Sequence, residues 1–147
     1  MKLLIVEDGE VERTLLTTLF TGESSVHMYL ARTLQEANAL LEKANFVVLD
    51  LTLPDASPEE SIEWMSKCGL PTIVYSSTWD KSIVSKAAKA GAVNFLTKGT
   101  SADQIMAAVH FALATEDLLF DKYEQRVAAC SELAERTRQK LLQAGLT

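Results

Sequence analysis

The sequence alternates short apolar runs with longer segments in which apolar residues recur every three or four positions. Five short runs and five longer segments follow one another from residue 3 to about residue 115. Four of the short runs are almost continuously apolar, as in strands whose two faces are both buried. Strands that alternate with helices pair in parallel through right-handed crossovers. The sequence therefore predicts an α/β protein, with a five-stranded parallel sheet covered on both faces by helices.

The pattern gives each predicted element approximate limits. Strands are expected at residues 3–6, 26–31, 46–49, 72–75 and 93–96, and helices at residues 10–21, 33–44, 59–67, 80–90 and 102–115. Gly22 and Gly91 follow two of the helices, at positions where glycine commonly ends a helix. Ser101 and Gln104 have the spacing of a capping box, which marks the start of the last helix in this series.

Composition excludes several function classes. The 147 residues suffice for one domain with a short appendage, and the net charge of -6 gives no positive surface for a nucleic-acid backbone. No apolar run approaches the roughly 20 residues of a membrane-spanning helix. Cys68 and Cys130 form no CxxC motif, which is typical of reduced cysteines in the cytoplasm. We therefore expect a cytoplasmic protein that binds neither nucleic acid nor membrane directly.

Charged and hydroxyl side chains stand where the predicted strands end. Glu7 and Asp8 follow the first strand, Asp50 the third, Ser76 the fourth and Lys98 the fifth. Carboxyl ends of parallel strands share one edge, where ligands bind. Each polar residue alone is explained by a strand reaching solvent, but the combination is not. Clustered carboxylates raise one another's pKa unless a cation is present, and oxygen ligands with this charge suit Mg²⁺. A lysine beside them provides a positive charge for a phosphate-sized anion.

In four stretches the sequence resembles the receiver domain of bacterial two-component response regulators. The stretches, in order, are LLIVEDGE, FVVLDLTLPD, LPTIVYSST and GAVNFLTKG. The resemblance implies a flavodoxin-like, doubly wound (βα)5 domain over residues 1–116, followed by a helical extension or linker over residues 117–147. The Lys98–Gly99 pair, with the TSADQIMAAV that follows, is similar to receivers that precede a LuxR-type helix-turn-helix.

The resemblance assigns chemistry to the strand ends. Asp50 corresponds to the phosphoacceptor, which takes a phosphoryl group from a sensor histidine kinase. Glu7 and Asp8 correspond to the acid pair that holds Mg²⁺ together with Asp50 and the backbone carbonyl of Thr52. Asp8 is expected to be the more direct ligand, and Glu7 to act largely through water. Lys98 corresponds to the lysine that pairs with the phosphoryl oxygens.

Two further residues correspond to the conformational switch of such domains. The Ser76 hydroxyl is expected to move toward the phosphoryl group, and Phe95 to turn inward when it does. Thr52 and Thr78 flank the site, either as residues that tune hydrolysis or as ordinary polar loop residues. The sequence departs from the family pattern at Gly99, where proline is commoner. It departs again in the loop after Leu53–Pro54, which lacks the usual glycine.

The C-terminal segment predicts a long sixth helix, because no glycine or proline interrupts residues 116–144. Apolar or small residues recur there at alternating steps of three and four: Phe120, Tyr123, Val127, Cys130, Ala134, Thr137 and Leu141. That spacing is typical of a coiled-coil seam, although the stripe could equally pack on the fifth helix of the same chain. A homodimer through the fourth and fifth helices and this segment is one expectation. The chain is either a receiver with its linker from a longer transcription factor or a natural stand-alone protein.

Two other function classes fit less well. An aspartyl-phosphate phosphatase uses an Asp-x-Asp motif, whereas Leu51 and Thr52 follow Asp50. A phosphorylation-independent scaffold usually lacks one of the acids or the lysine, and this chain keeps all of them. The sequence therefore predicts a phosphoacceptor signalling domain and not a turnover enzyme, with the scaffold as the alternative.

Overall fold

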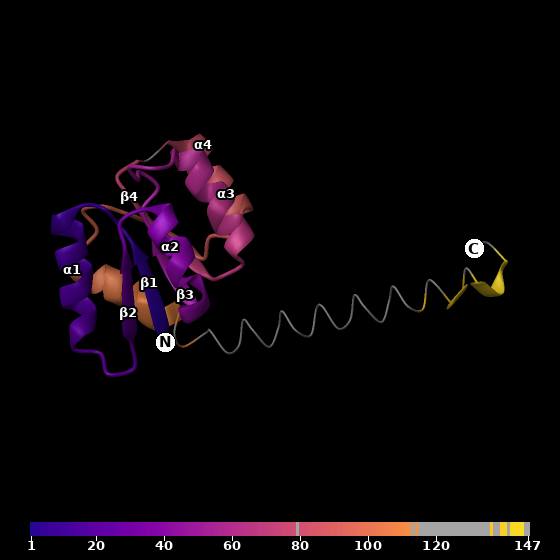
Figure 1. Cartoon of the computed structure of the whole chain (residues 1–147), viewed down its shortest axis with the longest axis horizontal. Helices are drawn as coiled ribbons and strands as arrows, with labels where there is room; N and C mark the ends of the chain where they lie inside the picture. Colours follow the sequence, from indigo (N-terminus) through magenta and orange to yellow (C-terminus); the bar gives the residue numbers. More distant parts are fainter. Residues whose placement is uncertain (79, 113, 115–135, 137–138, 141, 146–147) are drawn as a thin grey trace. The chain divides into compact units, whose positions relative to one another are not determined.

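The computed structural model describes residues 1–78, 80–112, 114, 136, 139–140 and 142–145 (Figure 1). The strands are β1 (Lys2–Val6), β2 (His27–Ala31), β3 (Phe46–Leu49), β4 (Thr72–Ser76) and β5 (Asn94–Thr97). The helices are α1 (Glu10–Thr21), α2 (Leu34–Leu40), α3 (Pro58–Cys68) and α4 (Lys81–Lys89), with a 3₁₀ turn at Leu41–Lys43. A fifth α-helix includes residues 102–112. The chain divides into two compact units, Met1–Val109 and His110–Thr147.

The five strands form one parallel sheet in the order β2-β1-β3-β4-β5. This order is that of the flavodoxin-like doubly wound fold, so the predicted fold class of the receiver is confirmed. The chain starts at β1, one strand in from the edge, continues to β2 at that edge, and then crosses back over β1 to β3. In the register of the sheet, Val6 at the end of β1 lies opposite Leu49 at the end of β3. Two segments more than 40 residues apart therefore end side by side.

Alternate strand residues face two separate layers of helix. Leu4, Val6, Val47, Leu49 and Val74 belong to one buried cluster with side chains of α2, α3 and α4. The intervening residues Leu3, Ile5, Phe46, Val48 and Ile73 are also buried, on the opposite face by the alternation of a strand. Helix α1 lies on the other side of the sheet from α2, α3 and α4 (Figure 1) and buries Leu16 and Phe20. This double burial explains the continuous apolar runs of the sequence.

Helix α2 is shorter than the sequence predicted. Thr33 has an extended backbone and its hydroxyl accepts a hydrogen bond from the Glu36 N–H, so the helix begins at Leu34. The chain then tightens into the 3₁₀ turn from Leu41, as is frequent at helix ends. One of the two hydrogen bonds of the capping box predicted for the fifth helix is present, because the Gln104 N–H donates to Ser101 Oγ at 3.3 Å.

The unit His110–Thr147 is described only in part. Residues 110–112, 114, 136, 139–140 and 142–143 are helical. The seven residues of the predicted seam lie outside the described residues, so the sixth helix and its stripe stay predictions. Among the residues that the structure describes, no helix is long and apolar enough to cross a membrane.

Candidate functional site

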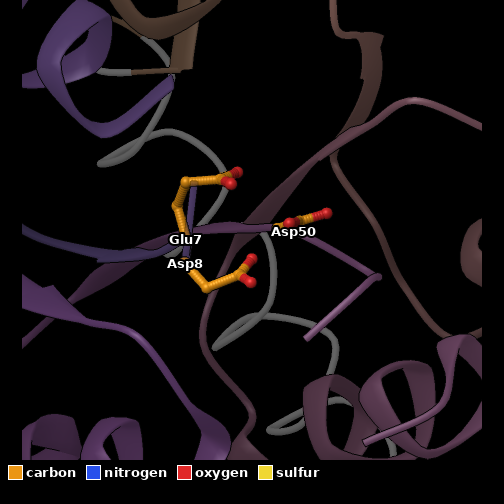
Figure 2. Close-up of side chains that lie close together, drawn as sticks. All are labelled: Glu7, Asp8 and Asp50. Atoms are coloured by element: carbon orange, nitrogen blue, oxygen red, sulfur yellow. The ribbon is translucent and has the colours of Figure 1, made fainter. Parts of the chain in front are cut away.

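The ends of β1 and β3 bring three carboxylates together. The Asp50 N–H donates to the Val6 carbonyl at 2.9 Å, which continues the parallel ladder one residue beyond the strands. The carboxylates of Glu7, Asp8 and Asp50 therefore gather at one edge of the sheet, with an oxygen of each within 4.8 Å of the others. Figure 2 shows Glu7 and Asp8 leaving neighbouring positions of the chain toward the side where Asp50 lies.

Lys98 reaches this cluster from the position directly after β5, the strand at one edge of the sheet. Its Nζ lies 3.1 Å from Glu7 Oε1 and 3.0 Å from Asp50 Oδ2. The Lys98 N–H donates to the Ser76 carbonyl at 2.9 Å, which fixes the start of the side chain beside β4. The ammonium also lies 5.9 Å from the centre of the Tyr75 ring, within range of a cation–π contact. The sequence predicted that these strand ends would meet, and the structure brings Glu7, Asp8, Asp50 and Lys98 together.

The cluster holds more negative than positive charge in a dry environment. Glu7 and Asp50 are each 1% exposed, while Asp8 is exposed at the rim. Burial, followed by the negative charge of Asp50, raises the pKa of Glu7 to about 7. Burial also raises the pKa of Asp50, although the Thr52 N–H and Lys98 oppose the shift. Burial alone would lower the pKa of Lys98, but its bonds to the two acids outweigh this effect and raise that pKa.

These residues fit a divalent cation. With all groups ionised, three carboxylates and one ammonium leave a local charge of about -2, which favours binding of a cation. Glu7 Oε2 is buried and has no hydrogen-bond partner among the described residues. A buried oxygen without a partner is unfavourable unless an ion or water satisfies it. Carboxylate oxygens are the ligands that Mg²⁺ prefers, so the donor set matches the predicted metal.

Asp50 is held by the main chain that follows it. The Thr52 N–H donates to Asp50 Oδ1 at 3.0 Å, while Lys98 binds Oδ2. Thr52 itself is exposed, between the buried side chains of Leu51 and Leu53. The two oxygens of Asp50 thus have different partners, which fixes the orientation of its carboxylate.

Ser76 and Phe95 lie close to the cluster in the chain but make other contacts. Ser76 is fully buried, and its Oγ accepts a hydrogen bond from the Thr78 N–H at 3.3 Å. No hydrogen bond joins Ser76 Oγ to Asp50 or Lys98 within the described part of the chain. Phe95 is half-buried against the apolar cluster that includes α2, α3 and α4. Their predicted switching roles are proposals that this arrangement allows.

Glycines shape both loops beside the cluster. A Cβ at Gly9 would collide with Glu12 Oε2 and lie 3.0 Å from Glu7 Oε1, so this position brings a fourth carboxylate near the site. Glu12 was not predicted, and its one signal in the sequence is the glycine directly after the acid pair. Gly99 has a φ of 107°, which the ring of a proline cannot adopt. The loop after Lys98 therefore has a backbone conformation that the commoner proline could not adopt at this position.

Asp55 and Tyr75 were also not singled out. The Asp55 carboxylate accepts hydrogen bonds from the main chain of α2, 20 and 21 residues away, and no local pattern predicts such a contact. Tyr75 belongs to an apolar strand and was counted as core. Its contact with Lys98 depends on the register of β4 and β5, which the sequence does not specify.

Comparison with known proteins identifies relatives of the first unit. The family model described as response regulator receiver domain matches residues 3–110. The KDP operon transcriptional regulatory protein KdpE of Escherichia coli (strain K12) is 33% identical over 113 residues, which are 75% of this chain and 50% of that protein. The transcriptional regulatory protein UhpA of Salmonella typhimurium is 40% identical over 63 residues, 43% of this chain and 32% of that protein. The chain spans half or less of the length of these curated relatives.

Solved structures have the same fold. A signal receiver domain from Vibrio parahaemolyticus has a TM-score of 0.70 and 26% identity, covering 80% of this chain and 95% of that one. A CheY-like response regulator receiver domain protein from Methanospirillum hungatei also has a TM-score of 0.70, at 20% identity, covering 79% and 95%.

Proposed function

The chain belongs to the response regulator receiver domain family, and from this premise we propose that it accepts a phosphoryl group on Asp50 from a sensor histidine kinase, in a reaction that requires Mg²⁺. The observation that carries the proposal is the placement of Asp50 between Lys98 and the acid pair. Phosphoryl transfer depends mostly on positioning and charge neutralisation, and these residues supply both. The domain is a signalling component and not a turnover enzyme.

Asp50 is the nucleophile of the proposed reaction. One of its carboxylate oxygens forms a bond to phosphorus while the bond from phosphorus to the kinase histidine breaks. The histidine nitrogen keeps the electron pair of that bond, and the product is an acyl phosphate. Before the transfer, the Thr52 N–H and Lys98 Nζ orient the two oxygens of Asp50. Afterwards, Lys98 can pair with a phosphoryl oxygen, which favours the product.

The metal ligands of the proposal are Glu7, Asp8, Asp50 and the backbone carbonyl of Thr52. Exposed Asp8 is accessible to an ion that arrives with its waters, whereas buried Glu7 already binds Lys98. When bound, Mg²⁺ supplies positive charge that offsets the charge on the phosphoryl oxygens. The unpartnered Glu7 Oε2 supports a role for this acid toward the ion, directly or through water.

The proposed output is a change of surface that begins at Ser76. Its hydroxyl would leave the Thr78 N–H and bind the new phosphoryl group, and Phe95 would turn further inward. Such a change shifts a population of existing conformations. We further propose that residues 1–116 form the receiver and that residues 117–147 link it to an output domain of LuxR type. The alternative is a scaffold in which the same fold acts without phosphorylation.

The assignment of Asp50 can be tested directly. Incubation of the protein with acetyl phosphate and Mg²⁺ should add one phosphoryl group, a gain of about 80 Da in intact mass. The Asp50→Asn variant should lose this species, and Asp103→Asn, which changes an exposed acid, should keep it. Modification that persists in Asp50→Asn would show that another residue accepts the group. A parent protein that stays unmodified under these conditions would favour the scaffold.

A further inference from the structure

The loop that follows Asp50 is tied to a helix from a different part of the chain. The Asp55 carboxylate accepts the Leu34 N–H at 3.1 Å through Oδ1 and the Gln35 N–H at 3.2 Å through Oδ2. The first N–H groups of a helix have no partner within the helix, so an outside acceptor stabilises them. Asp55 thus caps α2 from 20 residues away, with one oxygen for each donor.

The position of Asp55 in its loop makes this bond relevant to Asp50. Leu53 and Ala56 form a short bridge that closes a tight turn, and Asp55 stands within that turn. The Ala56 N–H lies 3.5 Å from the Leu53 carbonyl, a long hydrogen bond that closes the turn only weakly. The bonds of Asp55 to α2 are shorter and come as a pair. They therefore supply a restraint that the turn itself lacks.

Thr52 is the part of this loop that touches the site. It lies two residues after Asp50 and one residue before the turn, and its N–H holds Asp50 Oδ1. Under the proposed function its carbonyl would also be a ligand of the metal. If the turn shifts relative to α2, the Thr52 main chain moves with it, because Thr52 is bonded directly to Leu53, the first residue of the turn.

We propose that Asp55 is a positioning residue for the phosphoryl-transfer site: by fastening the turn Leu53–Ala56 to α2, it holds the Thr52 main chain against Asp50. The part of this inference that concerns metal and phosphoryl transfer rests on the proposed function. The part that concerns the Thr52 N–H stands on the hydrogen bonds alone. Within the described residues, no hydrogen bond or ion pair joins Asp55 to Asp50 or Lys98.

The chain offers a matched control at the same helix end. The Thr33 hydroxyl accepts the Glu36 N–H at 3.0 Å, next to the two donors that Asp55 accepts. Thr33→Ala therefore weakens the start of α2 without changing any contact of the loop. Asp55→Ala removes both acceptors, and Asp55→Asn keeps one oxygen acceptor with nearly the same shape. The three variants separate loss of a helix cap from release of the loop.

The first measurement is amide hydrogen exchange in the full chain without metal. Asp55→Ala should speed exchange of the Thr52 N–H by on the order of tenfold, because the loop opens more often. Asp55→Asn should give a smaller effect, and Thr33→Ala should leave Thr52 at the parent rate while speeding exchange of Glu36. Equal Thr52 exchange in the parent and Asp55→Ala would overturn the proposal. So would an equal increase in Thr33→Ala, because the effect would then come from the helix cap.

The second measurement adds Mg²⁺ and acetyl phosphate. Asp55→Ala should weaken Mg²⁺ binding, measured by calorimetry, and slow phosphorylation, each by roughly tenfold, as expected for a residue that acts through a ligand-bearing group. Asp55→Asn should restore part of both, and Thr33→Ala should match the parent. Parent values in Asp55→Ala would overturn the positioning role. A parent protein that binds no Mg²⁺ and accepts no phosphoryl group would instead refute the proposed function, and the exchange result would still decide whether Asp55 holds Thr52.

Discussion

Single residues show where function opposes folding in this molecule. Glu7 is almost fully buried and shares a lysine with Asp50, and its Oε2 has no hydrogen-bond partner in the part of the chain that the structure describes. The sequence predicted that clustered carboxylates would raise one another's pKa, and this holds for Glu7, whose pKa the negative charge of Asp50 raises. It is wrong for Asp50, because Glu7 lowers the pKa of Asp50 and burial is what raises it. The sequence did not reveal that burial would be the largest cause of both pKa shifts. Burial depends on the packing of the whole sheet edge, which no local pattern records.

Replacing Glu7 should stabilise the metal-free protein. The folded pKa of about 7 lies above the ordinary value of 4.5, so the folded state holds a proton that the unfolded chain releases between these values. Parent stability should therefore fall as the pH rises from 4.5 to 7, and stay low above 7. Glu7→Gln keeps an oxygen for Lys98 and the Gly9 N–H but carries no charge. In EDTA at pH 8 it should raise the free energy of unfolding by about 1–3 kcal/mol, with little gain near pH 4.5.

Chemical denaturation at the two pH values measures this effect. Asp103→Asn serves as the control, since it removes an exposed negative charge. The same excess of Mg²⁺ should stabilise the parent more than Glu7→Gln, because an ion that binds the folded state more tightly stabilises it more. A variant less stable than the parent in EDTA at pH 8 would mean that Glu7 has partners that outweigh its burial.

At the scale of elements, the strands and the helices α1, α3 and α4 were predicted to within one residue at each end, and helix α2 less well. Apolar runs buried on both faces leave little choice of limits, so β3 was predicted at its observed residues. Helix α2 was predicted to extend from residue 33 to residue 44 because its apolar spacing continues, yet its last turn is 3₁₀. The residues that position the site from other elements, such as Asp55, were missed because their partners are distant in the chain.

Two glycines at the ends of elements should respond oppositely to alanine. Gly99 follows β5 with a φ of 107°, and Gly22 ends α1 with a φ of -81°. A Cβ would meet no atom within 4 Å at either position, so only the backbone conformation differs. Gly99→Ala should lower the free energy of unfolding by about 1 kcal/mol, because a side chain strains this conformation. Gly22→Ala should raise the free energy of unfolding by about 0.5 kcal/mol, because alanine lowers the conformational entropy of the unfolded chain.

Urea denaturation of the two variants beside the parent provides the measurement. A Gly99→Ala variant as stable as Gly22→Ala would show that the loop after Lys98 relaxes to a negative φ. Its phosphorylation rate should then be compared with that of the parent, because Lys98 directly precedes this glycine.

At the scale of the whole molecule, the order of the strands explains the site. Lys98 directly follows β5 and Glu7 directly follows β1, and two strands separate β5 from β1, yet the long lysine side chain spans the distance. The chemistry of the site therefore depends on a correctly assembled sheet. The sequence identified the participants because parallel strands share an edge, and the family resemblance supplied their roles. The helical segment beyond the first unit stays a prediction from spacing alone.

Phosphorylation should strengthen self-association of the full chain. The predicted seam of residues 120–141 is weak, because Cys130, Ala134 and Thr137 are small or polar, so a dimer needs help from the receiver. Sedimentation of the parent with beryllofluoride and Mg²⁺, which mimic the phosphorylated state, should show a larger species than the parent without them. Ser76→Ala should bind beryllofluoride but respond less, because the proposed hydroxyl switch is absent. Identical sedimentation of the parent with and without beryllofluoride would refute phosphorylation-dependent dimerisation.

The unpartnered oxygen of Glu7 also bears on how such domains change over generations. A mutation that removes an acid from the cluster abolishes the proposed signalling but relieves repulsion in the folded protein. Selection for folding alone therefore does not maintain these acids. In a duplicated gene whose product no longer signals, we expect them to be substituted before other buried residues. Descendants that have lost phosphorylation are then expected to have a higher free energy of unfolding than their ancestor, which suits them to act as interaction modules.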